Sequence, residues 1–162
     1  MENNDLETTK NNEKLVDDLK QLNVKQLNYF NINENNQNLL IPCRVVSVYD
    51  GDTFTGALFC RQKANIFKIR ICGFDAPEKR PRKNIPDREN VIKKAKEARK
   101  FLISLFKQQN DIVYLHTVKN DKYGRILGNV YLDSNNLVDT CVTKLMIDNN
   151  HGYAYNGGKK KN

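Results

Sequence analysis

The chain has 162 residues, 39% of them hydrophobic, which is enough for one domain with its own core. Its net charge of +8 is uneven: residues 1–40 carry 4 Lys and 7 Asp/Glu (−3), and residues 41–162 carry 23 Lys/Arg and 12 Asp/Glu (+11). No window approaches the 18 apolar residues that a membrane-spanning helix needs, so no membrane segment is expected. The basic balance favours a polyanion such as nucleic acid as partner, with a merely soluble surface as the alternative.

The cysteines argue against zinc and for a reducing compartment. None belongs to a C-x-x-C pair, and all fall in apolar runs where a free thiol behaves as a small hydrophobe. They are Cys43, Cys60, Cys72 and Cys141. The polar stretch from Met1 to Lys14 does not resemble a signal peptide. We therefore expect an intracellular protein, cytoplasmic or nuclear.

The first 38 residues are expected to form a polar, acidic and largely disordered extension. Within it, Leu15, Leu19 and Leu22 recur at helical spacing and predict a short helix over about 12–23. The asparagine-rich stretch from Asn28 to Asn38 indicates a linker. The domain boundary is placed near residue 39, giving a domain over 39–156 and a basic tail over 157–162.

Three strands are expected next, separated by turns at Asp50-Gly51 and Arg61–Ala64. They are Ile41–Tyr49, Thr53–Phe59 and Asn65–Gly73. In the third strand the side chains alternate between two faces. Ile66, Lys68, Arg70 and Cys72 share one face, and Phe67, Ile69 and Ile71 share the other.

A charged, proline-rich loop over Pro77–Pro86 separates these strands from a long amphipathic helix over about Arg88–Lys107. Strands over Asp111–Thr117 and Ile126–Leu132 follow. Asn136 is expected to cap a last helix that ends before Gly152. Its expected core face is Leu137, Val138, Cys141, Val142, Leu145 and Met146. The order β-β-β-α-β-β-α predicts an α+β, mainly β fold: a five-stranded OB-fold barrel with two or three helices.

Two acidic segments follow strand ends, and each alone could be an ordinary turn. Asp50 and Asp52 bracket a glycine after the first strand, and Asp75-Ala76-Pro77-Glu78 begins where the third strand ends. Adjacent antiparallel strands can bring Asp52 and Asp75 together, with Glu78 close by. Such a cluster repels itself unless a cation or arginines compensate it. Hard cations prefer carboxylate oxygens from more than one segment, so the cluster favours a metal site.

Basic and aromatic side chains complete the set. Arg70 lies on the third strand, and Arg125 follows the turn Asp121-Lys122-Tyr123-Gly124. A guanidinium suits a phosphate because it donates two parallel hydrogen bonds, although a salt bridge to a nearby carboxylate is the alternative. Tyr153 and Tyr155 would face the same way in an extended segment. They could stack on a base or simply cover the barrel edge.

In this order and spacing, the motifs resemble those of the staphylococcal nuclease (thermonuclease-like) family over about residues 41–156. The resemblance implies an OB barrel with one Ca²⁺ ion that hydrolyses DNA and RNA with little sequence or sugar specificity. It implies cleavage between phosphorus and the 5′ oxygen, leaving 3′-phosphates. We expect a monomer that prefers single-stranded or frayed nucleic acid and does not bind membranes.

Carried over by position, the resemblance assigns the metal ligands and the base. Asp52, Asp75 and the main-chain carbonyl of Ala76 would bind calcium, with Asp50 near the ion but not bound to it. Glu78 would be the general base that acts on the attacking water.

The resemblance also assigns the substrate contacts. Arg70 and Arg125 would hold the phosphate and stabilise the developing charge, with Arg125 beside the leaving oxygen. Tyr153 and Tyr155 would line the nucleotide pocket, and Lys122 and Tyr123 would flank it.

The staphylococcal enzyme has a further helix after its tyrosine segment, whereas this sequence stops soon after Tyr155. Either the barrel manages without that helix or the N-terminal extension packs in its place. A noncatalytic nucleic-acid-binding module of the same family is the first rival interpretation. A protein-binding OB domain is the second, and the basic balance argues against it. The complete set of Arg70, Glu78 and Arg125 favours an enzyme.

Overall fold

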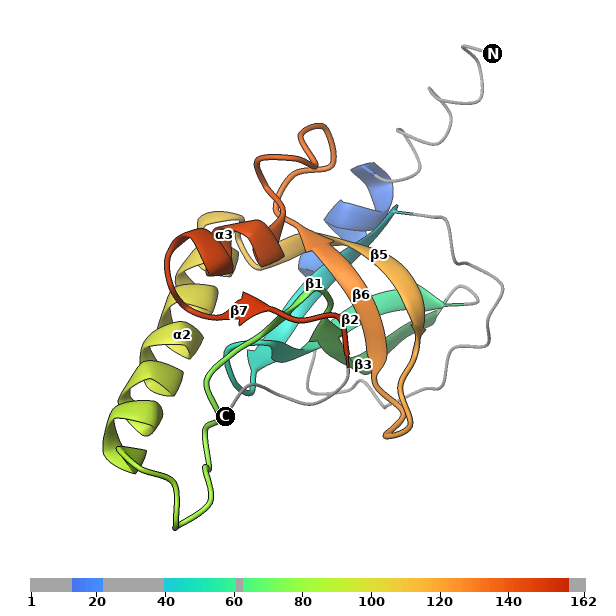
Figure 1. The fold of residues 1–162 in the computed structure, drawn as a ribbon. Coiled ribbons are helices and arrows are strands. Elements are labelled where there is room, and N and C mark those ends of the chain that lie inside the picture. The colour runs from blue at the N-terminus through green and yellow to red at the C-terminus, as the bar shows by residue number, and fades with distance from the viewer. Residues whose placement is uncertain (1–12, 22–39, 61–62, 158–162) are drawn as a thin grey trace.

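The computed structural model describes residues 13–21, 40–60 and 63–157, and the linker predicted over 28–38 lies outside them (Figure 1). A helix spans residues 13–21. The other elements are β1 (Leu40–Val48), β2 (Thr53–Cys60), β3 (Lys63–Ile71), β4 (Phe74–Asp75), α2 (Arg88–Gln108), β5 (Ile112–Asn120), β6 (Ile126–Tyr131), α3 (Val142–Asp148) and β7 (Tyr153–Ala154). No helix among the described residues is both long enough and apolar enough to cross a membrane.

Five strands close into a barrel in the order β1-β2-β3-β6-β5, and this confirms the predicted barrel and α+β class. All its pairs are antiparallel except β3 and β6, which run parallel from Ile69↔Ile126 to Ile71↔Gly128. The predicted alternation in β3 is also confirmed. Phe67, Ile69 and Ile71 are buried, whereas the side chains between them are exposed or half-buried.

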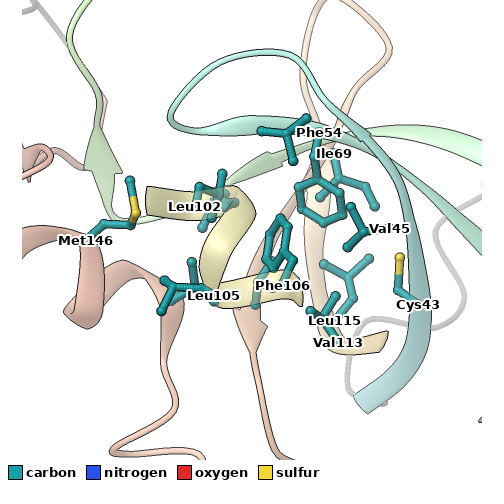
Figure 2. Close-up of a cluster of buried hydrophobic side chains, with 14 of the residues drawn as sticks. Cys43, Val45, Phe54, Ile69, Leu102, Leu105, Phe106, Val113, Leu115 and Met146 are labelled. Atoms are coloured by element: carbon teal, nitrogen blue, oxygen red, sulfur yellow. The ribbon is translucent and has the colours of Figure 1, made fainter. Parts of the chain in front are cut away.

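The apolar stripe of α2 completes the barrel core. Figure 2 shows Leu102, Leu105 and Phe106 of this helix among side chains from the strands. Phe106 packs on Phe54 of β2 with ring centroids 5.1 Å apart. Burying each such side chain stabilises the fold by about 1.5–3 kcal/mol. The helix therefore anchors the residues that precede it in the chain.

The helix over residues 13–21 packs on the barrel, where a short helix was expected over about 12–23. Leu19 is fully buried in a cluster with Ala57 and Ile112. The guanidinium of Arg44 donates to the carbonyls of Leu19 and Lys20 at 3.0 and 3.1 Å. These carbonyls lie at the end of the helix, where a cation is favourable.

The prediction for the start of the last helix is wrong. Residues 137–140 form a turn and α3 begins only at Val142, so Leu137 and Val138 are 40% and 74% exposed. The Asn136 side chain accepts from the backbone N–H of Asp139 at 3.2 Å, which caps a turn rather than a helix. Cys141 is extended and forms a β-bridge with Tyr131. The rest of the predicted face is confirmed, with Val142 and Met146 buried and Leu145 packed against the core.

The prediction that the cysteines behave as small hydrophobes in apolar surroundings is confirmed only in part. Cys43 is fully buried in the core, and burial raises the pKa of its thiol far above the usual range. Cys72 and Cys141 are free and half-buried. The side chain of Cys60 lies outside the described part of the chain.

Candidate active site

The loop between β1 and β2 is held tightly against two other segments. A Cβ at Gly51 would come within 2.6 Å of the Cβ of Ala76 and 3.0 Å of the Cβ of Ala98 on α2. Only glycine allows this approach. The backbone N–H groups of Tyr49 and Asp50 both donate to the carbonyl of Thr53, which closes the loop. The loop therefore presents Asp50 and Asp52 beside the segment that follows β4.

Arg70 joins the two aspartates that the sequence analysis paired. Its Nη1 lies 3.0 Å from Asp52 Oδ2, and its Nη2 donates to Asp75 Oδ1 at 2.7 Å. The β2–β3 register pairs Thr53 with Arg70, which places Asp52 next to the end of β3. Both aspartate residues are nearly inaccessible, at 4% and 3% exposed. We call Asp52, Arg70 and Asp75 the buried ion triad.

Both carboxylate oxygens of Asp52 also accept hydrogen bonds from neighbouring groups. Thr53 Oγ1 donates to Oδ1 at 2.8 Å, and the backbone N–H of Ala76 donates to Oδ2 at 3.4 Å. Burial alone would lower the pKa of the Arg70 guanidinium, but the charges of Asp52 and Asp75 outweigh it and raise this pKa. The Arg70 guanidinium therefore stays charged.

Asp50 lies beside the triad, and no salt bridge joins it to an arginine among the residues that the structure describes. Its Oδ1 accepts from the backbone N–H of Asp52 at 3.2 Å. Burial, and then the nearby charge of Asp52, raise the pKa of Asp50 to about 6. A carboxyl with such a pKa is partly protonated near neutral pH.

Glu78 is different because it is exposed. It follows Pro77, lines the same pocket as Asp52, and accepts from the backbone N–H of Arg80 at 3.3 Å. Its carboxylate can therefore meet solvent and a bound molecule, which the triad carboxylates cannot do as freely.

Arg125 is held by its own turn. Its Nε donates to Asp121 Oδ2 at 2.7 Å, while Asp121 Oδ1 accepts the backbone N–H groups of Tyr123 and Arg125 at 2.8 and 3.0 Å. Burial tends to raise the pKa of Asp121, but these hydrogen bonds and the charge of Arg125 lower it overall. Sequence reasoning gave Asp121 no role. The signal was an Asp that opens a tight turn four residues before an Arg.

A two-stranded sheet that the sequence did not predict brings the tyrosine segment to the site. β4 pairs antiparallel with β7, with Asp75 opposite Tyr153, and the Tyr153 hydroxyl donates to Asp75 Oδ2 at 3.2 Å. The backbone N–H of Tyr155 donates to the carbonyl of Gly73 at 3.0 Å. A Cβ at Gly152 would lie 2.8 Å from the Asp75 carbonyl oxygen, so this close pairing needs glycine.

Most of the predicted site residues line one pocket of about 530 Å³. Its walls are Asp50, Asp52, Arg70, Ala76, Pro77, Glu78, Asp121, Lys122, Tyr123, Arg125, Leu127 and Tyr155. Asp75 and Tyr153 are not among these wall residues. They are connected to the site by hydrogen bonds, because Arg70 donates to Asp75 and the Tyr153 hydroxyl also donates to Asp75. The pocket thus places acidic groups, two guanidiniums and two tyrosines around one space.

The oxygen atoms at this site are of the type that a hard cation prefers. Asp52 and Asp75 offer carboxylate oxygens that one guanidinium already holds close together, and calcium takes carboxylates, main-chain carbonyls and water. Within the described ranges, no group of three or more His, Cys, Asp or Glu side chains could hold a metal ion. An ion here would therefore need main-chain oxygen and water to complete its ligands.

The family model for staphylococcal nuclease homologues matches residues 68–159, more than half of the chain, and the chain belongs to this family. No curated protein matches it. The match contains Arg70, Asp75, Glu78, Arg125 and the tyrosine segment, whereas Asp50 and Asp52 precede it. Membership supports a nuclease-family or nucleic-acid-binding role.

Proposed function

We propose that the protein is a calcium-dependent endonuclease that hydrolyses DNA and RNA with little sequence or sugar specificity and leaves 3′-phosphates. The observation that carries this proposal is the shared pocket of Arg70, Glu78 and Arg125. A binding module needs cations for phosphate, but it does not need an exposed carboxylate in the same pocket as two guanidiniums.

The proposed roles follow from exposure and hydrogen bonding. Glu78, which is exposed to the pocket, would accept the proton of the attacking water. Arg125, which Asp121 orients through its Nε, keeps its other donors for the phosphate and the leaving 5′ oxygen. Arg70, which lines the pocket while two ion pairs hold it in place, would add positive charge there. Such donors lower the barrier when they bind developing charge better than the ground state.

Asp52, Asp75 and the main-chain carbonyl of Ala76 would hold the calcium ion. Bound there, calcium supplies positive charge beside the phosphate. Tyr153 would fix the orientation of Asp75 through its hydroxyl. Asp50 would lie beside the ligands without joining them, since its oxygen already accepts from Asp52 N–H.

The surface next to the pocket suits an extended polyanion. Residues 79–100 carry ten Lys/Arg and three Asp/Glu, a balance of +7. Within the described chain, none of these ten cations forms a salt bridge. Lys122, Tyr123 and Tyr155 line the pocket itself and would contact the nucleotide. Because rings stack on unpaired bases, single-stranded or frayed substrates should be preferred.

A noncatalytic nucleic-acid-binding module is the second candidate. It is favoured by the buried ion triad, in which Arg70 is already engaged by two carboxylates. In that case Arg70 would serve the fold and the basic surface would do the binding.

Digestion of plasmid DNA and of RNA separates the two candidates. We expect cleavage of both with Ca²⁺, none with EDTA, and 3′-phosphate ends on the products. Tight, salt-sensitive binding without cleavage in Ca²⁺ or Mg²⁺ would instead establish the binding module.

A further inference from the structure

Two tyrosine rings are unusually open on this surface. Among the described residues, Tyr49 and Tyr123 are the only large aromatic side chains that are exposed, at 56% and 72%. A lysine lies over each ring. Lys79 Nζ is 4.5 Å from the centroid of Tyr49, and Lys122 Nζ is 5.0 Å from that of Tyr123. The same pairing of an exposed ring with a cation thus occurs twice.

One pair lines the pocket, and the other pair is adjacent in sequence to residues that line it. Lys122 and Tyr123 line it directly from the β5–β6 turn. Tyr49 immediately precedes Asp50 and Lys79 immediately follows Glu78, and Asp50 and Glu78 are lining residues. Figure 1 shows the β5–β6 turn and the chain after β4 well apart. We call Tyr49 and Lys79 the second platform.

The second platform is held in place by main-chain contacts. Lys79 Nζ donates to the Tyr49 carbonyl at 3.3 Å, and the backbone N–H of Tyr49 donates to the Thr53 carbonyl at 2.9 Å. No salt bridge of Lys79 with a carboxylate occurs within residues 13–21, 40–60 and 63–157. Its charge is therefore available to a phosphate. The ring, with a cation at one face and more than half of the residue exposed, can offer its other face to a base.

We infer that the second platform is a nucleotide subsite that stacks a base and contacts its phosphate on the wall away from Tyr123. This subsite extends the proposed nuclease function and rests on it. A strand bound across the pocket would have a stacked base at each end, with the reacting phosphate between them. An oligonucleotide long enough to reach both rings would then bind more tightly than a mononucleotide.

The chain contains no tryptophan, so a single one can report stacking. The Tyr49→Trp variant is titrated with thymidine 3′,5′-bisphosphate and with an eight-nucleotide oligothymidylate, in EDTA to prevent cleavage. The matched control is Val138→Trp, which is 74% exposed on the turn before α3. Tyr123→Trp reports on the other exposed ring, that of the Lys122–Tyr123 pair. We expect the octanucleotide to quench Tyr49→Trp and Tyr123→Trp but not Val138→Trp.

Affinity provides the second readout. Tyr49→Ala should lower the affinity for the octanucleotide about 5- to 150-fold, the range for one stacked base, and leave the affinity for the bisphosphate unchanged. Tyr49→Phe keeps the ring and should bind as the unaltered protein does.

The outcomes separate this inference from the proposed function. Quenching of Tyr123→Trp without quenching of Tyr49→Trp, or normal octanucleotide affinity in Tyr49→Ala, overturns the second platform and leaves the nuclease intact. Quenching of both without any cleavage in Ca²⁺ supports the platform and overturns the nuclease. No response from either probe overturns the second platform, and cleavage in Ca²⁺ then decides the nuclease by itself.

Discussion

The two arginines of the pocket are held in opposite ways. Arg70 is 16% exposed, and its ion pairs reach Asp52 and Asp75 on other segments. Arg125 is 24% exposed, and its partner Asp121 lies in the same turn, four residues away. The buried ion triad therefore depends on the whole barrel, whereas the Arg125 turn depends only on itself. A substitution at Arg70 should therefore reduce both stability and cleavage, whereas a substitution at Arg125 should mainly reduce cleavage.

Arg70→Ala should have the largest effect. Removing this guanidinium leaves two buried carboxylates without their cation, which typically costs about 3–5 kcal/mol of stability. Urea unfolding would measure this loss, and cleavage should be lost as well. A variant that is as stable as the unaltered protein and cleaves at the normal rate would show that Arg70 is needed for neither property.

Arg125→Ala should slow cleavage by about 10²–10³-fold, the usual cost of removing one donor to developing charge. Its stability should change by less than about 1 kcal/mol, because the ion pair is local and partly exposed. Rates and urea midpoints measured on the same preparation test both halves. Equal destabilisation of the Arg125 and Arg70 variants would show that the two arginines do not differ in their contribution to stability.

Gly51→Ala tests the contact that places the β1–β2 loop. The added methyl would meet the Cβ atoms of Ala76 and Ala98, so we expect a loss of about 1–3 kcal/mol from overpacking. The control is Gly124→Ala in the Arg125 turn. That position has open space but a φ of 77°, so only backbone strain applies. Thermal unfolding would compare the two variants, and an unaffected Gly51→Ala protein would show that the loop is not fixed by this packing.

The smallest effect concerns pH and Asp121. Its folded pKa is lowered, so the stabilisation it gives is complete above its unfolded pKa of about 4. That stabilisation is lost as pH falls through the lowered folded pKa. The stability difference between the unaltered chain and Asp121→Asn should therefore be present at pH 6 and shrink toward pH 3. A difference that stays constant would mean that Asp121 does not act through its charge.

Much of this architecture follows from sequence periodicity. The alternation of Phe67, Ile69 and Ile71 fixes which face of β3 points inward, and with it the placement of Arg70 on the other face. A two-residue strand has no periodicity, so the β4–β7 pairing and the bond from Tyr153 to Asp75 were not predictable.

Other features depend on competition between local and distant contacts. Asn136 matches a helix cap by type, but the Tyr131–Cys141 bridge keeps the chain extended until Val142. The packing of Leu19 on Ala57 depends on residues far away in the sequence. The roles of Glu78 as general base and of the calcium ligands come from the family resemblance, and they stay predictions.

The most direct test of the central claim is Glu78→Gln in calcium. Glu78 is exposed and outside the buried ion triad, so the variant should fold normally and bind oligonucleotide as the unaltered protein does. Single-turnover cleavage should fall by about 10²–10⁴-fold, as expected for loss of a general base. Cleavage at an unchanged rate would contradict the account.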